Sequence, residues 1–283
     1  MSTTSKDRVW TPPGPGLGRA ELLEEVLAAC HSPSYTPPVT PAVAMEVLAM
    51  ARRPEVFFDD VARVCEKDPL VAARVLRVAQ SAYFSRGSRI VSLKDAIVRV
   101  GVQTLANLFL AETMTTRVFR APGYDAAMSS LRRHSAMTAH IARTLAAPMP
   151  LHREHAFLFG LLHDVGVASA AYLVGTRVPF AKAWPTILDA HAEAGRILCR
   201  AWKLPAEIEI VVAYHHGGRV GGTLHPGACL VGVAEWIATD LGFGLDGEER
   251  PARPETELRL LGLDDEAIAS ATADAKNAAS RMG

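Results

Sequence analysis

The stretch LFGLLHDVGVAS, residues 158–169, ends an apolar run in the polar pair His163-Asp164 and continues with a small Val-Gly. Two interpretations are open at this point. The pair is either the polar end of a buried helix or part of a metal site, since imidazole and carboxylate groups both bind divalent ions. The choice depends on whether other residues of ligand type face the same interior.

Helical patterns dominate the rest of the chain. It has 283 residues, 49% hydrophobic and 21% charged, which is typical of a globular protein. Asp68 before Pro69 and Ser92 three residues before Asp95 are helix-start signals, and Gly101 is a stop signal. No strand alternation or hairpin pattern is convincing. We therefore expect an all-α fold.

Composition suggests where this helical chain divides. Residues rich in Pro, Gly, Ser and Thr open the chain, and helix-breaking residues gather at 120–130 and 243–256. The predicted segments are a disordered 1–18, a helical half 19–125, a second helical half 126–242, and a linker with a helical tail at 243–283.

Charge and cysteine content exclude several classes of protein. Thirty basic and thirty acidic residues give a formal net charge of zero, so no DNA binding is expected. The four cysteines form no CxxC pair, which indicates reduced thiols and neither a disulfide framework nor a thiolate zinc site. The sequence shows no signal peptide and no run of about 18 apolar residues. We expect no membrane span and a cytoplasmic location.

Several ligand-type residues occupy the apolar faces of separate predicted helices. His134 shares its helical stripe with Ile141, and His191 shares its stripe with Ile187. One inward histidine is usually a hydrogen-bonded core residue. Several unpaired polar groups in one core would cost about 1–3 kcal/mol each, and one shared cation would satisfy them all. The candidate metal ligands are His134, His163, Asp164, His191, His215, His216 and Glu235.

The donor set limits the metal and its chemistry. Neutral imidazole suits Fe, Mn, Zn or Ni, and a carboxylate can bridge two ions, so the site would be mono- or dinuclear. Helix bundles commonly hold such sites in their cores. A dinuclear version, with ions about 3.5–4 Å apart, would be suited to phosphoester hydrolysis.

The order of these residues resembles the HD superfamily of metal-dependent phosphohydrolases, and most specifically its HDOD branch, the HD-related output domain. The resemblance runs from about Val39 to Leu241 and depends on many short motifs in the right order. The motifs are PPVTPAVAMEVLAMA (37–51), EKDPLVAARVLRVAQSAYF (66–84), IVSLKDAIVRVG (90–101), LANLFLAETM (105–114), RRHSAMTAHIARTLA (132–146), EHAFLFGLLHDVG (154–166), AHAEAGRILCRAWKLPAEIEIVVAYHH (190–216) and LVGVAEWIA (230–238).

The resemblance implies an all-helical protein in which an N-terminal bundle packs against an HD-like bundle. It also implies a bacterial signalling or regulatory role through protein partners, often without assigned catalysis. The seven candidate ligands match positions that resemble HD-superfamily ligands. The last ligand is usually Asp, and Glu235 stands in its place. The extra methylene moves the carboxylate by about a bond length, which matters because coordination distances vary by only about 0.2 Å.

Three departures from the family pattern weaken an enzymatic interpretation. Val167 stands where cyclic di-GMP phosphodiesterases of this superfamily often carry Lys, and no Gly-Tyr-Pro signature follows His216. Gln80 replaces the usual Asn. A non-catalytic regulatory module is therefore favoured. A metal-dependent hydrolase of a nucleotide or cyclic dinucleotide, and a sensor that binds a nucleotide or another small ligand without hydrolysing it, remain the alternatives.

Overall fold

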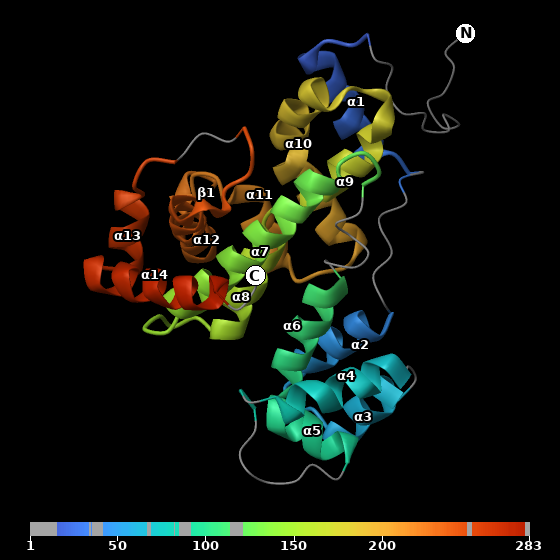
Figure 1. The fold of residues 1–283 in the computed structure, drawn as a ribbon, viewed down its shortest axis with the longest axis vertical. Helices are drawn as coiled ribbons and strands as arrows, with labels where there is room; N and C mark the ends of the chain where they lie inside the picture. The colour runs from blue at the N-terminus through green and yellow to red at the C-terminus, as the bar shows by residue number, and fades with distance from the viewer. Residues whose placement is uncertain are drawn as a thin grey trace. The chain divides into compact units, whose positions relative to one another are not determined.

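Among the described residues, regular structure is helical apart from one short hairpin, which confirms the all-α class (Figure 1). The computed structural model describes residues 16–33, 35, 42–66, 69–81, 83–84, 92–113, 121–247 and 251–280. The disorder predicted for 1–18 falls mainly on residues outside these ranges. Contacts divide the chain into a smaller unit, residues 39–117, and a larger unit formed by residues 1–38 and 118–283. Each unit is described by itself.

Helix signals in the sequence account for the described part of the smaller unit. Its helices are α2 (Ala42–Ala51), α3 (Phe58–Glu66), α4 (Pro69–Gln80), α5 (Leu93–Val100) and α6 (Val102–Thr113). The Ser92 hydroxyl accepts a hydrogen bond from the backbone N–H of Asp95 at 3.0 Å, and α5 ends at Gly101, whose φ of 86° suits glycine. Helix α4 begins at Pro69 as predicted, and Asp68 lies outside the described residues.

The larger unit contains the candidate ligands. Its elements are α1 (Arg19–His31), α7 (Asp125–Leu145), α8 (Arg153–Leu162), α9 (Val165–Val174), the 3₁₀ turn η2 (Gly175–Arg177), α10 (Phe180–Ala201), α11 (Ala206–Tyr214), β1 (Arg219–Val220), β2 (Thr223–Leu224), α12 (Pro226–Ala238), the π-helical turn η3 (Thr239–Phe243), α13 (Glu255–Leu261) and α14 (Asp265–Ala279).

Two helix pairs form the centre of this unit. Helix α7 packs along α8, and α9 packs along α10. Helices α11 and α12 cover α8, while α1 packs on α10 and α9 and buries Leu22 and Val26 there. Helix α1 thus lies in the larger unit although it precedes the smaller unit in sequence. The segment boundaries inferred from composition remain predictions.

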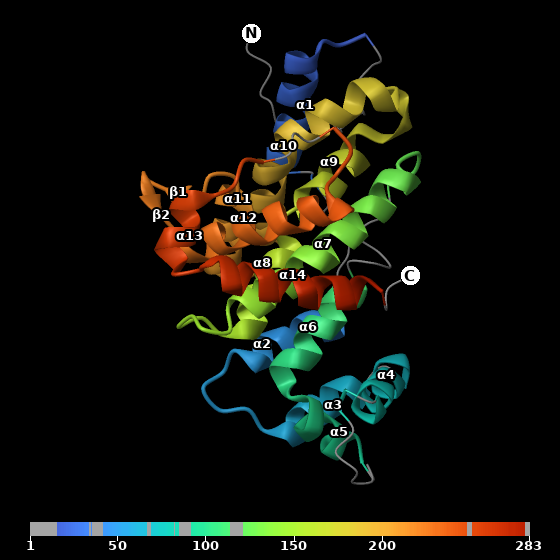
Figure 2. The ribbon, with the colours of Figure 1, turned by 60° about the vertical axis from the view of Figure 1, so that its left-hand side comes forward.

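The C-terminal helices α13 and α14 extend the core of the larger unit. Figure 2 shows α14 lying across α7, and the two helices are in contact. Leu258, Leu263, Ala271 and Ala275 are buried in one hydrophobic cluster with residues of α7 and α12. The C-terminal segment is therefore an integral layer over the helices that carry His134 and Glu235.

The strand prediction needs one correction. Residues 219–224 form a two-stranded antiparallel hairpin, in which Arg219 pairs with Leu224 and Val220 with Thr223. Gly221 and Gly222 make the turn with φ of 55° and 85°, which glycine adopts without strain. The expectation that no hairpin occurs is wrong here, because two residues per strand are too few to show alternation.

One stretch of the described residues is long and apolar enough to cross a membrane. It covers residues 153–177, and 94% of its most apolar part is buried inside the structure. His163 and Asp164 interrupt this stretch, so it contains no unbroken run of about 18 apolar residues, and the expected absence of a membrane span stays a prediction. Burial explains the apolar composition, because α8 and α9 form the interior of the larger unit.

Candidate metal centre

The pair His163-Asp164 joins two buried helices. His163 caps the C-terminus of α8, and Asp164 stands at the N-terminus of α9. Both side chains are completely buried. Because the chain turns between two core helices at this point, consecutive residues can both direct their side chains into the same interior. The pair is thus more than the polar end of a single helix.

Two glycines bring the neighbouring helices close to this pair. A β-carbon on Gly160 of α8 would lie 2.7 Å from the backbone of Ala139 on α7. A β-carbon on Gly166 of α9 would lie 1.8 Å from the carbonyl oxygen of His191 on α10. Only glycine permits such backbone approach. These crossings set His163 beside His134 and Asp164 beside His191.

Asp164 lies at the centre of four buried imidazoles. Its Oδ2 atom is 3.4 Å from the Nε2 atoms of both His134 and His163. Its Oδ1 atom is 3.4 Å from the Nε2 atoms of both His191 and His215. The two Nε2 atoms within each histidine pair are 3.0 and 3.3 Å apart. One carboxylate therefore faces two separate pairs of ring nitrogens.

Backbone contacts fix the tautomer of these four histidines. Each Nδ1 atom lies within hydrogen-bond distance of a backbone carbonyl oxygen, which can only accept. Nδ1 must then carry the proton, and in a neutral ring the inward Nε2 is left with its lone pair. The acceptors are the carbonyl oxygens of Phe243 for His134, Gly160 for His163, Leu188 for His191 and Val212 for His215.

The centre is consequently a cluster of acceptors without donors. Both oxygens of Asp164 are buried and have no hydrogen-bond partner. Buried polar groups without partners are costly, and they are rare unless an ion or a water satisfies them. Four lone pairs and a carboxylate converging at these distances, with the outer ring nitrogens bonded to carbonyls, are what a divalent cation requires. The residues present fit a metal.

Protonation states agree with that fit. Burial lowers the pKa of His163 below its ordinary value and lowers the pKa of His215 to about 4. Neutral imidazole and ionised carboxylate are the forms that bind metals.

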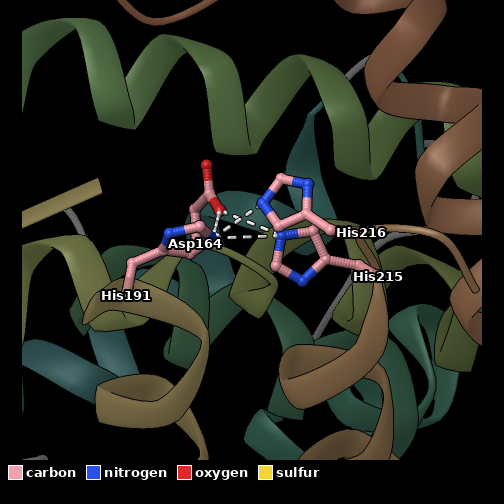
Figure 3. A group of neighbouring side chains, drawn as sticks. All are labelled: Asp164, His191, His215 and His216. Carbon is pink, nitrogen blue, oxygen red and sulfur yellow. Dashed lines mark hydrogen bonds and ion pairs between the residues drawn. The ribbon is translucent and has the colours of Figure 1, made fainter. Parts of the chain in front are cut away.

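All seven residues proposed from the sequence come together in two groups. Asp164, His191, His215 and His216 form one group, drawn in Figure 3, whose side chains converge from separate elements. His134, His163 and Glu235 form the other. Within each group, one ligand atom per residue lies within 4.8 Å of all the others. Glu235 is buried on α12, so its longer side chain reaches the site that aspartate would usually supply.

Two pockets of the larger unit reach this centre. The first, which we call the Glu235 pocket, has a volume of about 290 Å³ and is lined by residues that include His215, His216, Cys229, Glu235 and Glu257. The second, the Trp184 pocket, has a volume of about 500 Å³ and is lined by Arg19, Trp184, Pro185, Leu188, Asp189, His191, His216 and Gly247. His216 thus borders both pockets.

The sequence that forms this centre matches the model of a known protein family. The model of the HDOD domain matches residues 38–217, which is more than half of the chain. The chain belongs to the HDOD family. The family resemblance inferred from the sequence motifs is therefore confirmed. Glu235 and helices α12 to α14 lie beyond the matched residues.

Solved structures share the HDOD fold. A Geobacter sulfurreducens HDOD domain protein of unknown function is 22% identical, with a TM-score of 0.66, and the match covers 91% of this chain and 97% of that one. A Shewanella amazonensis “Putative metal-dependent phosphohydrolase” is 20% identical, with a TM-score of 0.66 and coverages of 91% and 99%. A Marinobacter aquaeolei “Putative signal transduction protein” is 20% identical, with a TM-score of 0.67 and coverages of 92% and 63%.

Curated relatives are longer than this HDOD chain. An uncharacterized protein of Treponema pallidum is 26% identical over 194 residues, which are 63% of this chain and 37% of that protein. Ribonuclease Y of Deinococcus radiodurans is 30% identical over 137 residues, which are 48% of this chain and 20% of the enzyme. This chain thus matches little more than a third of the Treponema protein and a fifth of Ribonuclease Y.

The positions at which this HDOD chain departs from hydrolases can now be located. Val167 lies on α9 and is completely buried, so an apolar side chain fills the place of the expected lysine. The residues after His216 form the glycine-turn hairpin. Gln80 ends α4 in the smaller unit and is exposed, and nothing in the structure explains the change from Asn.

Sequence patterns missed several residues that shape the centre. Gly160 and Gly166 set helix spacing, and the backbone carbonyl of Phe243 orients His134. Glu257 of α13 lines the Glu235 pocket, far along the chain from the ligands. The small Val-Gly directly after His163-Asp164 was the available signal for Gly166. A backbone carbonyl has no residue-type signal and could not have been found.

Proposed function

We propose that the chain is a regulatory HDOD module of bacterial signal transduction, non-catalytic and cytoplasmic, that acts through contacts with protein partners. The proposal rests on two features of the centre taken together. Donor-free Asp164 and the imidazoles around it suit a bound metal, while an apolar Val167 fills the lysine position. The name carried by the Marinobacter structure points in the same direction.

A metal would serve this module by joining helices. His134, His163 and Glu235 would hold one ion, while His191, His215 and His216 would hold another, with Asp164 shared between them. The donors suit Fe, Mn, Zn or Ni in a mono- or dinuclear site. When bound, such ions act as Lewis acids and lower the pKa of coordinated water. The ligand residues lie on α7, α10 and α12 and at the C-terminal ends of α8 and α11, so a bound metal would hold these five helices together.

The surroundings of the centre favour a role without hydrolysis. Among the described residues that line the two pockets, Arg19 is the one arginine or lysine. Both of its hydrogen bonds to Asp189 are 2.8 Å long, so its charge is already paired. Glu235 and Glu257 add negative charge to the Glu235 pocket. A phosphate group bound there would therefore depend on the metal for positive charge, because the described lining offers no unpaired lysine or arginine to stabilise the charge that develops during hydrolysis.

Turnover assays test this proposal directly. The purified chain, loaded in turn with Fe, Mn, Ni and Zn, should hydrolyse none of a broad panel of phosphoesters. The variant His163→Ala/Asp164→Ala is the matched control. Turnover that is present in the wild type and lost in the variant would overturn the non-catalytic role.

The second candidate is a metal-dependent phosphohydrolase acting on a nucleotide or cyclic dinucleotide. It is supported by the two complete ligand groups and by the openings of both pockets on His216. The name carried by one Shewanella structure is in line with it. The same panel decides between the candidates, because a hydrolase must show metal-dependent turnover of at least one nucleotide.

A nucleotide could also bind without being hydrolysed. The Trp184 pocket supports this alternative, because its volume of about 500 Å³ suits a small molecule and it contains one aromatic ring and one arginine. Thermal-shift measurements with nucleotides test it, since a ligand that prefers the native state raises apparent stability. No shift at saturating concentrations would exclude nucleotide binding.

A further inference from the structure

His216 differs from the four histidines around Asp164 in three respects. It is exposed, whereas the other four are buried. It lies beyond α11, which ends at Tyr214, whereas His215 keeps helical dihedral angles as the cap of that helix. Its Nδ1 atom makes no hydrogen bond to a carbonyl oxygen in the described residues, whereas each of the other four rings is fixed in this way.

Two glycines with left-handed backbone angles follow His216. Gly217 and Gly218 follow with φ of 84° and 64°, a region that other residues enter only with strain. A β-carbon on Gly217 would meet nothing within 4 Å. Gly218, by contrast, is fixed, because its N–H donates to the carbonyl oxygen of Tyr214 at 3.0 Å. Position 217 therefore leaves open space beside the backbone of His216, while the contact at Gly218 holds the chain to the end of α11.

The Nε2 atom of His216 nevertheless reaches the centre. It lies 2.9 Å from the Nε2 atom of His191, which is itself 3.4 Å from the Oδ1 atom of Asp164. Both pockets border His216. If this ring swings away, the position that it leaves opens on both pockets and thus on solvent.

We propose that His216 is a displaceable ligand, and that a small oxygen- or nitrogen-donor molecule from solvent takes its coordination position. This inference rests on the metal-binding part of the proposed function. Asp164, His191 and His215 form the permanent part of the group, because burial and carbonyl contacts hold them in place. Apart from the paired Arg19, no described lysine or arginine lines either pocket, which favours a small donor over a polyanion that would need cationic side chains around it.

Cobalt substitution tests this inference, with azide as the probe. The full chain is loaded with Co(II), and its metal content, visible spectrum and rate of metal release to a chelator are measured for the wild type, His216→Ala and His215→Ala. His216→Ala should keep stoichiometric cobalt, and His215→Ala should lose it. Azide should change the spectrum in the wild type and bind about fivefold more tightly to His216→Ala, since it no longer competes with a bound side chain.

The outcomes separate this inference from the metal proposal. If wild-type protein takes up no cobalt, the metal-binding part of the proposed function and this inference both fail. If wild-type protein binds cobalt but His216→Ala loses it as fully as His215→Ala, only the displaceable role is overturned. Unchanged azide affinity in a cobalt-loaded His216→Ala would also overturn it. Circular dichroism of each variant shows that lost metal is not lost folding.

Discussion

The α-carbon of Gly166 faces the carbonyl oxygen of His191 so closely that a β-carbon at position 166 would lie 1.8 Å from that oxygen. The same carbon would lie 2.4 Å from the backbone nitrogen of Gly195. Helices α9 and α10 therefore touch backbone to backbone two residues after Asp164. This contact sets the distance between the Asp164 carboxylate and the His191 imidazole.

Replacing Gly166 by alanine should destabilise the fold and the centre together. The new methyl group must separate α9 from α10, and overpacking of this kind costs roughly 3 kcal/mol or more. Urea denaturation measures the loss of stability, and metal content measures the effect on the centre. Gly16→Ala is the control, because its methyl group meets nothing within 4 Å. A Gly166→Ala protein as stable as Gly16→Ala would refute the close crossing.

Asp164→Asn should stabilise the metal-free protein while abolishing metal binding. The amide N–H groups can donate to imidazole lone pairs that face only acceptors in the wild type. Satisfying these buried groups is worth about 1–3 kcal/mol of unfolding free energy at neutral pH. Asp189→Asn, a surface change that weakens the pair with Arg19, should lose at most about 1 kcal/mol. A loss of stability in metal-free Asp164→Asn would contradict the assigned tautomers.

Lowering the pH should reduce the free energy of unfolding of the metal-free protein, because its buried histidines resist protonation. Burial lowers the pKa of His215 to about 4, below the ordinary value of 6.5. Between about pH 6.5 and about pH 4 the His215 side chain is therefore protonated in the unfolded chain but not in the folded chain. The free energy of unfolding has its full value above about pH 6.5 and falls as the pH drops toward about 4. Denaturation between about pH 7.5 and about pH 4.5 measures the slope. His215→Asn should flatten this slope.

The C-terminal layer offers a matched pair of leucines on one helix. Leu258 of α13 is 3% exposed within the cluster shared with α7 and α12, whereas Leu260 is 46% exposed. Leu258→Ala should lower the free energy of unfolding by about 2–5 kcal/mol, and Leu260→Ala should change it by less than about 0.5 kcal/mol. Equal effects of the two changes would show that α13 does not pack as described.

Patterns that depend on one helix were predictable from the sequence. The period of 3.6 residues placed His191 on the same face as Ile187 and Leu198, and all three are buried. The caps at Ser92 and Gly101 follow from local backbone chemistry and were also predicted. The same periodicity placed His134, His215 and Glu235 on inward faces, whereas His163, Asp164 and His216 were proposed as polar residues at helix ends and from the family resemblance.

Features that depend on contacts between helices were not predictable. Gly160 and Gly166 mark close crossings, but a glycine does not reveal which backbone it approaches. The orientation of His134 by the Phe243 carbonyl depends on the path of the chain after α12. The Gly221-Gly222 turn is a hairpin signal that could have been recognised, although strands of two residues made it weak.

Metal content tests the central claim most directly. Wild-type protein, as isolated and after loading with Fe, Mn, Zn or Ni, is compared with Asp164→Asn by elemental analysis. The account predicts about one to two ions per chain in the wild type and none in the variant, which should still fold. Equal metal content in the two proteins, or no metal in the wild type after loading, would contradict a metal centre at His163-Asp164.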